Sequence, residues 1–297
     1  MVTKPSRSSF ADIRGLRHHL REWGDTSSRS PERPTLVLLH GWMDVSASFQ
    51  FVVDALREER HVLAPDWRGF GLSAWAGTDS YWFPDYLADL DRILERVSPG
   101  QAVDLAGHSM GGNVACLYAG IRPARVRRLI NLEGFGLAEQ SAQSSVARYA
   151  RWLDEVVSEQ RFRDYPDFDT LAARLRRENP RLGEARADFL ARHWAAQDGG
   201  GRVRLLCDPS HRRVNPVRYR VDEAFACWQA VEAPVLWVDG ADSTTPSQLG
   251  LDASALALRR GQFRSLVHEA IADCGHMLHL DQPVSLAHRI EAFLGAG

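Results

Sequence analysis

The sequence predicts an α/β protein with a mostly parallel sheet, helices on both faces of that sheet, and a helical cap inserted after the strand 126–132, which follows the small-residue helix 113–119. Three observations predict this class. Short apolar runs alternate with amphipathic segments in the first part of the chain, and the alternation resumes near the C-terminus. Between these two parts lies a long stretch of helical pattern, rich in Arg, Glu and Trp, without a clear buried strand.

Each expected element follows from its local pattern. The first few residues are expected to form a flexible leader. Residues 13–23 then mix apolar and basic side chains, as an exposed edge strand or hairpin does. Short apolar runs bounded by turn residues indicate strands buried on both faces: 35–39, 61–64, 102–106, 126–132, 235–238 and 265–271. Apolar stripes or small-residue runs indicate the helices between them: 46–59, begun by Ser46 as a cap, 84–97, 113–119 and 284–294.

This order predicts one core with one insertion. Residues 1–135 and 232–297 are expected to form the core, and residues 136–231 the helical cap. With 297 residues, of which 44% are hydrophobic, the chain can bury a substantial core and is not a disordered chain.

Charge and cysteine content exclude several classes of partner. The net charge of −2 gives no overall attraction to nucleic acid or to an anionic membrane, so neither partner is expected. The four cysteines lack the paired short spacing of a disulfide framework or a zinc ribbon, which fits a reducing compartment. The sequence shows no signal peptide and no run of about 18 apolar residues, so we expect a soluble cytoplasmic protein.

The strongest chemical signal is Gly107-His108-Ser109-Met110-Gly111, which matches G-x-S-x-G. A nucleophile on a sharp turn between a strand and a helix has a strained backbone, and side chains two residues before and after it would crowd the turn. The helix N-terminus beneath the hydroxyl favours developing negative charge. Because the motif follows a predicted strand and precedes a predicted helix, we expect Ser109 to be a nucleophile.

A second glycine-containing loop, His40-Gly41-Trp42, follows the first buried strand. In a parallel sheet this loop borders the same edge as the nucleophile turn. Gly41 allows close approach of the backbone, so the amides of Trp42 and Met110 are candidates for an oxyanion hole. His40 itself is expected to be a structural hydrogen-bonding residue.

The turn after the second strand, residues 66–73, has a structural interpretation. Gly69 and Gly71 suit a turn that needs positive φ, and Asp66 and Arg68 are expected to hold the turn by hydrogen bonds.

The general base is expected late in the chain. His276 lies in Asp273-Cys-Gly-His-Met277, after the last predicted strand and before the closing helix, and the glycine before it lets the loop carry the imidazole over the edge of the sheet. His279 lies nearer the helix and is expected to be structural. The two histidines lack the H-E-x-x-H arrangement, so no metal site is predicted.

Two carboxylates are candidates for the third member, which would orient the imidazole of His276. Asp242 follows the strand 235–238 and fits the commoner chain order of Ser, acid and His, so it is preferred. Glu133 ends the preceding strand and is the alternative acid. A carboxylate just beyond a buried strand needs a partner in either case.

At these motifs the chain resembles the α/β-hydrolase superfamily from about residue 34 to its C-terminus. Residues 40–49 and 208–219 resemble the serine hydrolase-like subgroup. The resemblance implies the following site residues: Ser109 as nucleophile, His276 as base, and Trp42 and Met110 as donors of the oxyanion amides.

The chain departs from the family pattern at the acid. Family members usually place the acid where this chain has Ser243, so Asp242 is displaced by one residue. Glu133 matches an alternative acid position of some dehalogenase-like members. Dehalogenases and the related epoxide hydrolases use an aspartate nucleophile, and Ser109 argues against both activities.

The leading hypothesis is a serine esterase that cleaves a carboxylic ester or related small acyl compound through an acyl-enzyme, without a cofactor or metal. The expected partner is a small apolar acyl substrate chosen by the cap. Four tryptophans are candidates for its lining, with packing in the core as the alternative for each: Trp42, Trp152, Trp194 and Trp228. Two other functions stay open. A cofactor-independent dioxygenase of the same fold shares the segment 66–69 and an acid in the position of Glu133, and a non-catalytic pseudo-hydrolase would bind a ligand without turnover.

Overall fold

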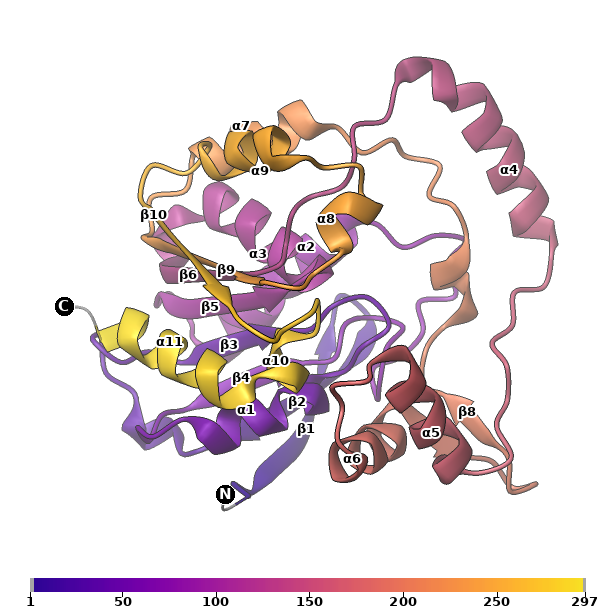
Figure 1. Cartoon of the computed structure of the whole chain (residues 1–297), viewed down its shortest axis with the longest axis horizontal. Helices are drawn as coiled ribbons and strands as arrows, with labels where there is room; N and C mark the ends of the chain where they lie inside the picture. Colours follow the sequence, from indigo (N-terminus) through magenta and orange to yellow (C-terminus); the bar gives the residue numbers. More distant parts are fainter. Residues whose placement is uncertain (1–2, 296–297) are drawn as a thin grey trace.

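The protein contains an eight-stranded sheet with strand order β1-β2-β4-β3-β5-β6-β9-β10. This computed structural model describes residues 3–295. Strands β4, β3, β5, β6, β9 and β10 run parallel to one another, whereas β1 and β2 form a hairpin at one edge and β2 pairs antiparallel with β4 (Figure 1). The fold class predicted from the sequence is confirmed.

The elements have the following bounds. The strands are β1 Ser6–Ile13, β2 Leu16–Trp23, β3 Leu36–Leu39, β4 Val62–Pro65, β5 Val103–His108, β6 Val126–Leu132, β7 Ala195–Gln197, β8 Val203–Leu205, β9 Val235–Gly240 and β10 Leu266–Ile271. The α-helices are α1 Gln50–Ala55, α2 Phe83–Val97, α3 Met110–Ile121, α4 Ser145–Val157, α5 Phe168–Glu178, α6 Glu184–Trp194, α7 Val221–Gln229, α8 Thr245–Gln248, α9 Ala253–Arg260, α10 Leu278–Asp281 and α11 Pro283–Gly295.

Helices cover both faces of the sheet because the central strands are apolar on both sides. In β3, Leu36 and Leu38 pack into a cluster with α1 and α11, while Val37 and Leu39 pack into another with α2 and α3. Successive strand residues point to opposite faces, so one short apolar run supplies two cores. All four side chains are buried, as a doubly covered sheet requires.

The N-terminal part differs from two sequence expectations. Strand β1 begins at Ser6 and pairs with β2 along its whole length, so most of the expected leader is part of the sheet. The helix expected over residues 46–59 is a 3-10 turn, Ser46–Phe49, followed by the short helix α1. The Ser46 side chain makes no cap, and its backbone N–H donates instead to Asp66 Oδ1 at 2.7 Å.

The segment between β6 and β9 is mainly helical and forms two groups. Helices α5 and α6 and the β7–β8 hairpin share a small apolar core of their own beside the sheet (Figure 1). Helix α7 packs on α3, where a Cβ on Gly120 would lie 1.8 Å from the carbonyl oxygen of Cys227. By its packing, α7 therefore lies in the layer that covers the sheet, within the stretch 136–231 that the sequence assigns to the cap.

Between residues 3 and 295, the helices are too short or too polar to cross a membrane.

Candidate active site

The G-x-S-x-G segment forms the tight turn that its spacing predicts. Ser109 joins β5 to α3 with φ 51° and ψ −115°, a strained conformation for a residue with a side chain. A Cβ on Gly107 would lie 2.2 Å from the carbonyl oxygen of Gly111, and a Cβ on Gly111 would lie 2.3 Å from that of Leu39. The two glycines are therefore required for the backbones to meet at this turn.

A cavity of about 360 Å³ lies over the Ser109 turn. Trp42, Ser109 and Met110 line it together, so the two predicted oxyanion donors and the predicted nucleophile share one space. Met110 is the first residue of α3, and the first amides of a helix have no acceptor within that helix. The N-terminus of α3 also favours negative charge beside Ser109.

A buried carboxylate supports the imidazole of His276. The Nδ1 atom of His276 lies 2.7 Å from Oε2 of Glu133, whose side chain is fully buried. The same carboxylate accepts hydrogen bonds from the N–H of Gly240 at 2.8 Å and from the hydroxyl of Ser243 at 2.6 Å. These donors are the hydrogen-bond partners that the sequence analysis expected a carboxylate at this buried position to need.

The turn that presents Glu133 lies directly beside the nucleophile turn. Glu133 has φ 55°, and Asn131 closes the loop by bonding both the N–H and the C=O of Gly134 at 2.9 Å. The N–H of Ser109 donates to the carbonyl of Leu132 at 2.8 Å. Glu133 lines the same cavity as Ser109.

The preference for Asp242 does not agree with this geometry. Asp242 lies in the loop after β9, where its carboxylate is 48% exposed and pairs with the guanidinium of Arg181 at 2.6 Å. The neighbouring residue, Ser243, is the one that faces inward, onto Glu133. Asp242 therefore points away from His276, one residue before the position that faces inward. The carboxylate that bonds to the imidazole is that of Glu133, the alternative acid.

Two buried histidines, His108 and His279, lie next to the loop of His276. The Nε2–H of His108 donates to the carbonyl oxygen of His276 at 2.8 Å, and the two rings lie 4.7 Å apart. Burial keeps the pKa of His108 well below its ordinary value, so this ring is a neutral donor. His279 is also fully buried and donates to Asp44 at 3.1 Å, which fits the structural part expected of it.

Asp44, His108 and His279 are also a group of described residues whose ligand-type atoms lie close enough to hold a metal ion, within 4.8 Å of one another. Two of these side chains already bond to each other, because His279 donates to Asp44. An ion bound there would have to replace that hydrogen bond.

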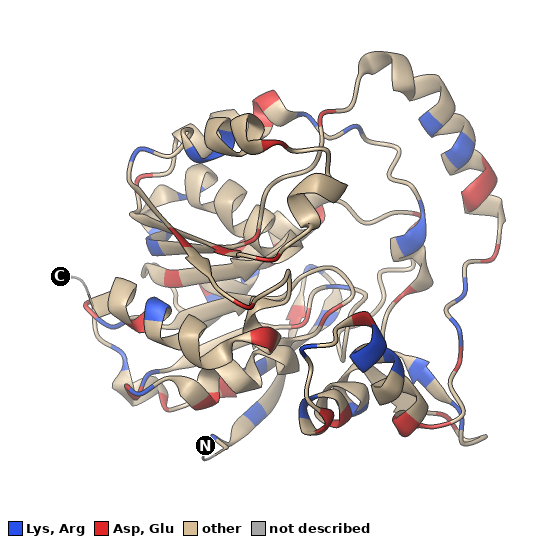
Figure 2. Ribbon diagram, in the orientation of Figure 1, with Lys and Arg blue, Asp and Glu red and all other residues tan. Residues whose placement is uncertain are grey.

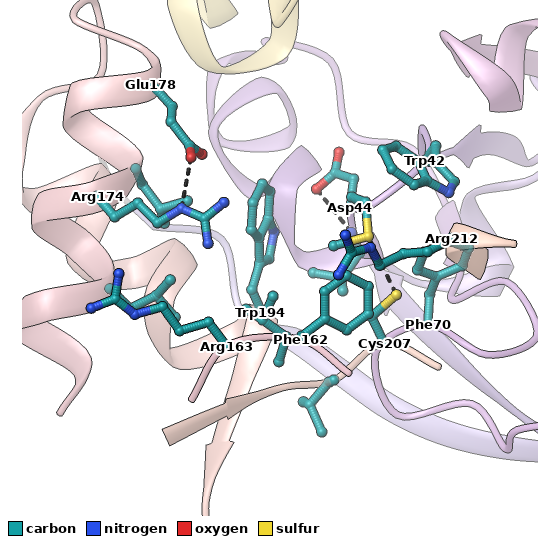
Figure 3. Close-up of a pocket in the computed structure, with 16 residues that line it drawn as sticks. Trp42, Asp44, Phe70, Phe162, Arg163, Arg174, Glu178, Trp194, Cys207 and Arg212 are labelled. Atoms are coloured by element: carbon teal, nitrogen blue, oxygen red, sulfur yellow. Dashed lines mark hydrogen bonds and ion pairs between the residues drawn. The ribbon is translucent and has the colours of Figure 1, made fainter. Parts of the chain in front are cut away.

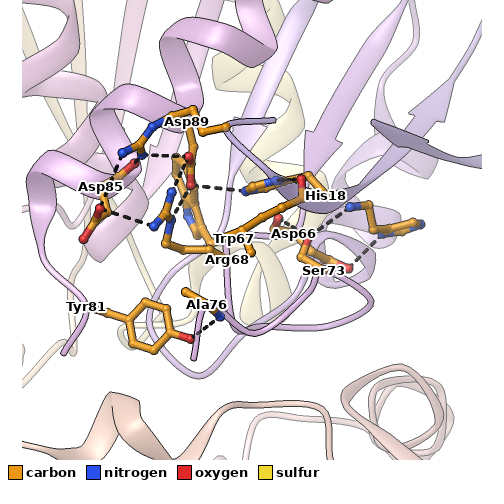
Figure 4. A network of polar contacts seen from close by, with 12 residues as sticks. His18, Asp66, Trp67, Arg68, Ser73, Ala76, Tyr81, Asp85 and Asp89 are labelled. Atoms are coloured by element: carbon orange, nitrogen blue, oxygen red, sulfur yellow. Dashed lines mark hydrogen bonds and ion pairs between the residues drawn. The ribbon is translucent and has the colours of Figure 1, made fainter. Parts of the chain in front are cut away.

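The turn after β4 is held as the sequence predicts. Gly69 and Gly71 have φ of 76° and 56°, and Asp66 accepts from the N–H of Leu72 at 2.9 Å. Arg68 bonds outside the turn: its guanidinium makes two hydrogen bonds, 2.5 and 2.6 Å long, with Asp89 of α2 (Figure 4). Arg68 thereby ties the turn to a helix.

His40 is part of the same structural framework. Its Nδ1–H donates to the carbonyl of Gly41 at 2.8 Å and its Nε2 accepts from the N–H of Trp67 at 3.0 Å. Burial lowers the pKa of His40, so the ring is neutral and structural, as expected from the sequence.

Several lining residues have no signal in the sequence patterns. The cavity over Ser109 includes four polar or aromatic side chains that sequence reasoning missed: Tyr81, Tyr86, His211 and Arg213. His211 is stacked between Phe70 and Tyr81, with ring centroids 3.9 and 3.8 Å away. His211 and Arg213 lie in the segment 208–219, which the sequence analysis identified through its resemblance to the serine hydrolase-like subgroup. That resemblance was the one signal in the sequence for these two residues.

The tryptophans are divided between the cavities and the core. Trp42 lines the cavity over Ser109, and both Trp42 and Trp194 line a second cavity next to it. Trp228 is buried and stacks on Phe263 at 5.5 Å, so it packs in the core. Trp152 lies on α4 and lines neither cavity.

Acidic and basic residues are interleaved along the whole ribbon (Figure 2). This distribution agrees with the small net charge of the chain, −2.

Comparison with known proteins places the chain in a family. The model of the alpha/beta hydrolase fold matches residues 34–283. The chain belongs to the α/β-hydrolase family. The Ser109 turn and the loop of His276 of this α/β hydrolase both lie within the matched region.

The relatives of this α/β hydrolase agree with that assignment. A serine hydrolase-like protein of Danio rerio is 25% identical over 92% of this chain and 86% of its own length. The thioesterase domain from the curacin biosynthetic pathway has a TM-score of 0.85 and 28% identity, covering 97% of this chain and 99% of that one. An esterase of Mycobacterium tuberculosis has a TM-score of 0.73 at 19% identity, covers 99% of this chain and 92% of its own, and shares the fold. The resemblance to the serine hydrolase-like subgroup is confirmed.

Proposed function

We propose that this α/β hydrolase is a serine hydrolase that cleaves a carboxylic ester or a related small acyl compound through an acyl-enzyme. The observation that carries the proposal is the 2.7 Å contact between His276 Nδ1 and the buried carboxylate of Glu133, at the edge of the cavity that Ser109 lines. A serine at the helix N-terminus and a carboxylate-supported imidazole are the parts that acyl transfer needs.

The tautomer of His276 follows from its hydrogen bond. Because Glu133 accepts from Nδ1–H, the Nε2 atom of the neutral ring is left as a proton acceptor. In the proposed mechanism, Nε2 takes the proton of the Ser109 hydroxyl while the oxygen attacks the acyl carbon, and the Glu133 carboxylate stabilises the imidazolium that forms. The proton then passes to the leaving oxygen, and water releases the acyl group by the same steps.

The negative charge on the attacked carbonyl oxygen needs donors. We assign this role to the backbone amides of Trp42 and Met110, because both residues line the cavity beside Ser109. The N-terminus of α3 adds a favourable field at the same position.

The cavity over Ser109 suits an apolar acyl group. Its wall is largely aromatic and aliphatic, with Trp82, Phe83, Phe135 and Leu137 among the lining residues. Burial of an acyl chain against such a wall stabilises the complex roughly in proportion to the apolar area removed from water.

The comparisons support an acyl substrate in general terms. The solved structure that has a TM-score of 0.85 and 28% identity is named as a thioesterase domain. The Danio rerio relative is named as serine hydrolase-like. Both names fit attack of Ser109 on an ester or thioester.

A fluorophosphonate probe and a series of p-nitrophenyl esters test the proposal. The intact protein should be labelled and should hydrolyse short or medium acyl esters, and Ser109→Ala should abolish both labelling and turnover. Ser210→Ala, in the segment over the same cavity, is the matched control and should keep both. Ligand binding without labelling or turnover would instead support the non-catalytic pseudo-hydrolase.

A further inference from the structure

We infer that the acyl part of the substrate carries a neutral oxygen that accepts a hydrogen bond, and that the side-chain amide of Asn113 donates to this oxygen. The inference rests on the proposed function and deepens it, because it names a group on the acyl chain that Ser109 receives. It follows from a buried N–H donor without a partner, one helical turn from the nucleophile.

Asn113 lies on α3, close to Ser109. Its backbone N–H donates to the carbonyl oxygen of Ser109 at 2.9 Å, so the helix fixes the two residues relative to each other. One turn of an α-helix rises about 5.4 Å. Both residues line the cavity of about 360 Å³. An acyl chain on the Ser109 oxygen can therefore reach the side chain of Asn113 with the third or fourth atom of the chain.

One hydrogen bond fixes the orientation of the Asn113 amide. Its Oδ1 atom accepts from the N–H of Gly136 at 2.7 Å. Only the oxygen of a side-chain amide can accept from a backbone N–H, so the nitrogen is the other end of the group. This bond accounts for the oxygen of the side chain and leaves the nitrogen without a structural part.

The Nδ2 group of Asn113 has no acceptor within residues 3–295. The residue is 6% exposed, and the described chain offers this nitrogen no hydrogen-bonding oxygen. It is not among the polar atoms of that range that are both enclosed and without a partner, so it is open to the cavity that Asn113 lines. A buried donor without an acceptor costs free energy, which an acceptor on the substrate would recover.

The other buried polar side chains of this cavity already have partners. The Tyr81 hydroxyl donates to a carboxylate at 2.6 Å, and the Tyr86 hydroxyl contacts an imidazole nitrogen at 3.4 Å. Glu133 accepts the three hydrogen bonds described above. Among the buried lining residues, the free donor therefore belongs to Asn113.

The charges in the cavity favour a neutral acceptor over an anion. Glu133 is a buried carboxylate in the same wall and would repel an anionic acyl group. Arg213 also lines the cavity, but it faces Asp79 at 3.7 Å and donates to two oxygens of the chain. An ether, keto or hydroxyl oxygen accepts a hydrogen bond from Asn113 without placing a further charge beside Glu133.

The second cavity does not offer this arrangement (Figure 3). It has a volume of about 510 Å³, and its lining includes the charged side chains of Arg163, Arg174 and Arg212. Neither Ser109 nor Asn113 lines it. An acyl group that contacts both of these residues must therefore lie in the first cavity.

Three p-nitrophenyl esters with acyl chains of equal length test the inference: pentanoate, ethoxyacetate and 3-methoxypropanoate. Each ether has an oxygen in place of a methylene group, at the third or the fourth position of the chain. An ether oxygen accepts a hydrogen bond but cannot donate one, so it matches the Nδ2–H of Asn113. The readout is the oxygen preference, which is kcat/KM for each ether ester divided by kcat/KM for the pentanoate.

Two substitutions remove the donor. Asn113→Asp keeps an oxygen for the N–H of Gly136, and Asn113→Leu has a similar size but no polar group. In both variants the oxygen preference should fall about fivefold or more below that of the wild type, the effect of one lost hydrogen bond. A general effect on folding or on the Ser109 turn changes kcat/KM for all three esters alike and cancels in this ratio.

Asn215→Asp is the matched control, because Asn215 lines the same cavity but uses both ends of its amide. Its Nδ2 donates to the carbonyl oxygen of Tyr81 at 2.9 Å, and its Oδ1 accepts from the N–H of Val217 at 2.8 Å. This variant should keep the oxygen preference of the wild type.

The position of the oxygen follows from the same data. A fall in preference for one ether only supports the inference and identifies the third or the fourth position of the chain. An oxygen preference in Asn113→Leu equal to that of the wild type for both ethers, or an equal fall in Asn215→Asp, would overturn the inference.

A binding measurement separates this inference from the proposed function. If the wild type hydrolyses none of the esters and Ser109 is not labelled by the fluorophosphonate probe, the proposed function fails. Calorimetric titration with the anilides of the same three acids then tests Asn113 alone. A loss of affinity in Asn113→Leu that is larger for an ether anilide than for the pentanoic anilide supports the inference. Equal losses, or no binding by the wild type, reject it.

Discussion

The Oε2 atom of Glu133 and the Nδ1 atom of His276 lie 2.7 Å apart, although Glu133 follows the carboxyl end of β6 and His276 lies in the loop after β10. Strand β6 brings Glu133 to the same edge of the sheet as the nucleophile turn. The loop after β10 brings His276 over that edge from the far side of β9. The carboxylate that bonds to the imidazole thus comes from the turn after β6, the neighbour of β5, and Ser109 directly follows β5.

The first prediction compares the two candidate acids. Glu133→Gln should lower kcat for a p-nitrophenyl ester by about 10³-fold or more, because an amide no longer stabilises the imidazolium. Asp242→Asn should stay close to the wild-type rate, since it loses only an exposed ion pair with Arg181. Equal rates for Glu133→Gln and the wild type, or a collapse of activity in Asp242→Asn, would reverse the assignment.

The second prediction concerns the nucleophile turn. Gly107→Ala should destabilise the fold by about 2 kcal/mol or more and abolish ester turnover, because the new Cβ would meet the Gly111 carbonyl oxygen at 2.2 Å. Gly183→Ala is the control, since its Cβ would meet no atom within 4 Å and its φ of −67° is one that alanine adopts. Urea unfolding followed by circular dichroism measures both, and a stable, active Gly107→Ala would contradict the turn geometry.

The third prediction tests the buried ion pair that fixes the turn after β4 (Figure 4). Asp89 is fully buried and bonds to Arg68, Arg14 and His18, so Asp89→Ala should cost about 3 kcal/mol, because it removes the buried partner of Arg68 and leaves this arginine with the more exposed Asp85. The exposed pair of Arg220 and Glu223 is the comparison, and Glu223→Ala should cost less than about 1 kcal/mol. The free energy of unfolding of each variant is measured by denaturant unfolding. Similar losses in Asp89→Ala and Glu223→Ala would contradict the prediction that the buried pair contributes more than the exposed pair.

The fourth prediction is a pH dependence of stability. Burial lowers the pKa of His211 from 6.5 to about 3, so the unfolded chain binds a proton below pH 6.5 that the folded protein does not. Its contribution to stability is therefore complete above pH 6.5 and is lost as the pH falls towards 3. Between pH 7 and pH 5 this amounts to about 2 kcal/mol for one histidine.

His211→Gln removes this proton-binding difference. The free energy of unfolding, measured at pH 7 and at pH 5, should fall less between the two values in His211→Gln than in the wild type. Parallel losses in the two proteins would show that His211 ionises in the folded state near its ordinary pKa.

Local patterns alone determined the layers and the nucleophile turn of this protein. Two-sided apolar runs such as residues 35–39 require a sheet covered on both faces, and the glycines around Ser109 allow a turn that larger residues would obstruct. Both depend on steric and burial requirements within a few residues. They can therefore be predicted before the fold is known.

Only the tertiary structure decided which carboxylate meets His276 and which residues of the segment 136–231 line the cavity over Ser109. Asp242 and Glu133 both end strands at the same edge of the sheet, and the direction of the loop after β9 turns Ser243 inward and Asp242 outward. The second cavity depends on packing between the cap and the loop of Trp42, which are distant in sequence. Such contacts leave no local period or spacing, because they arise when separate elements pack together.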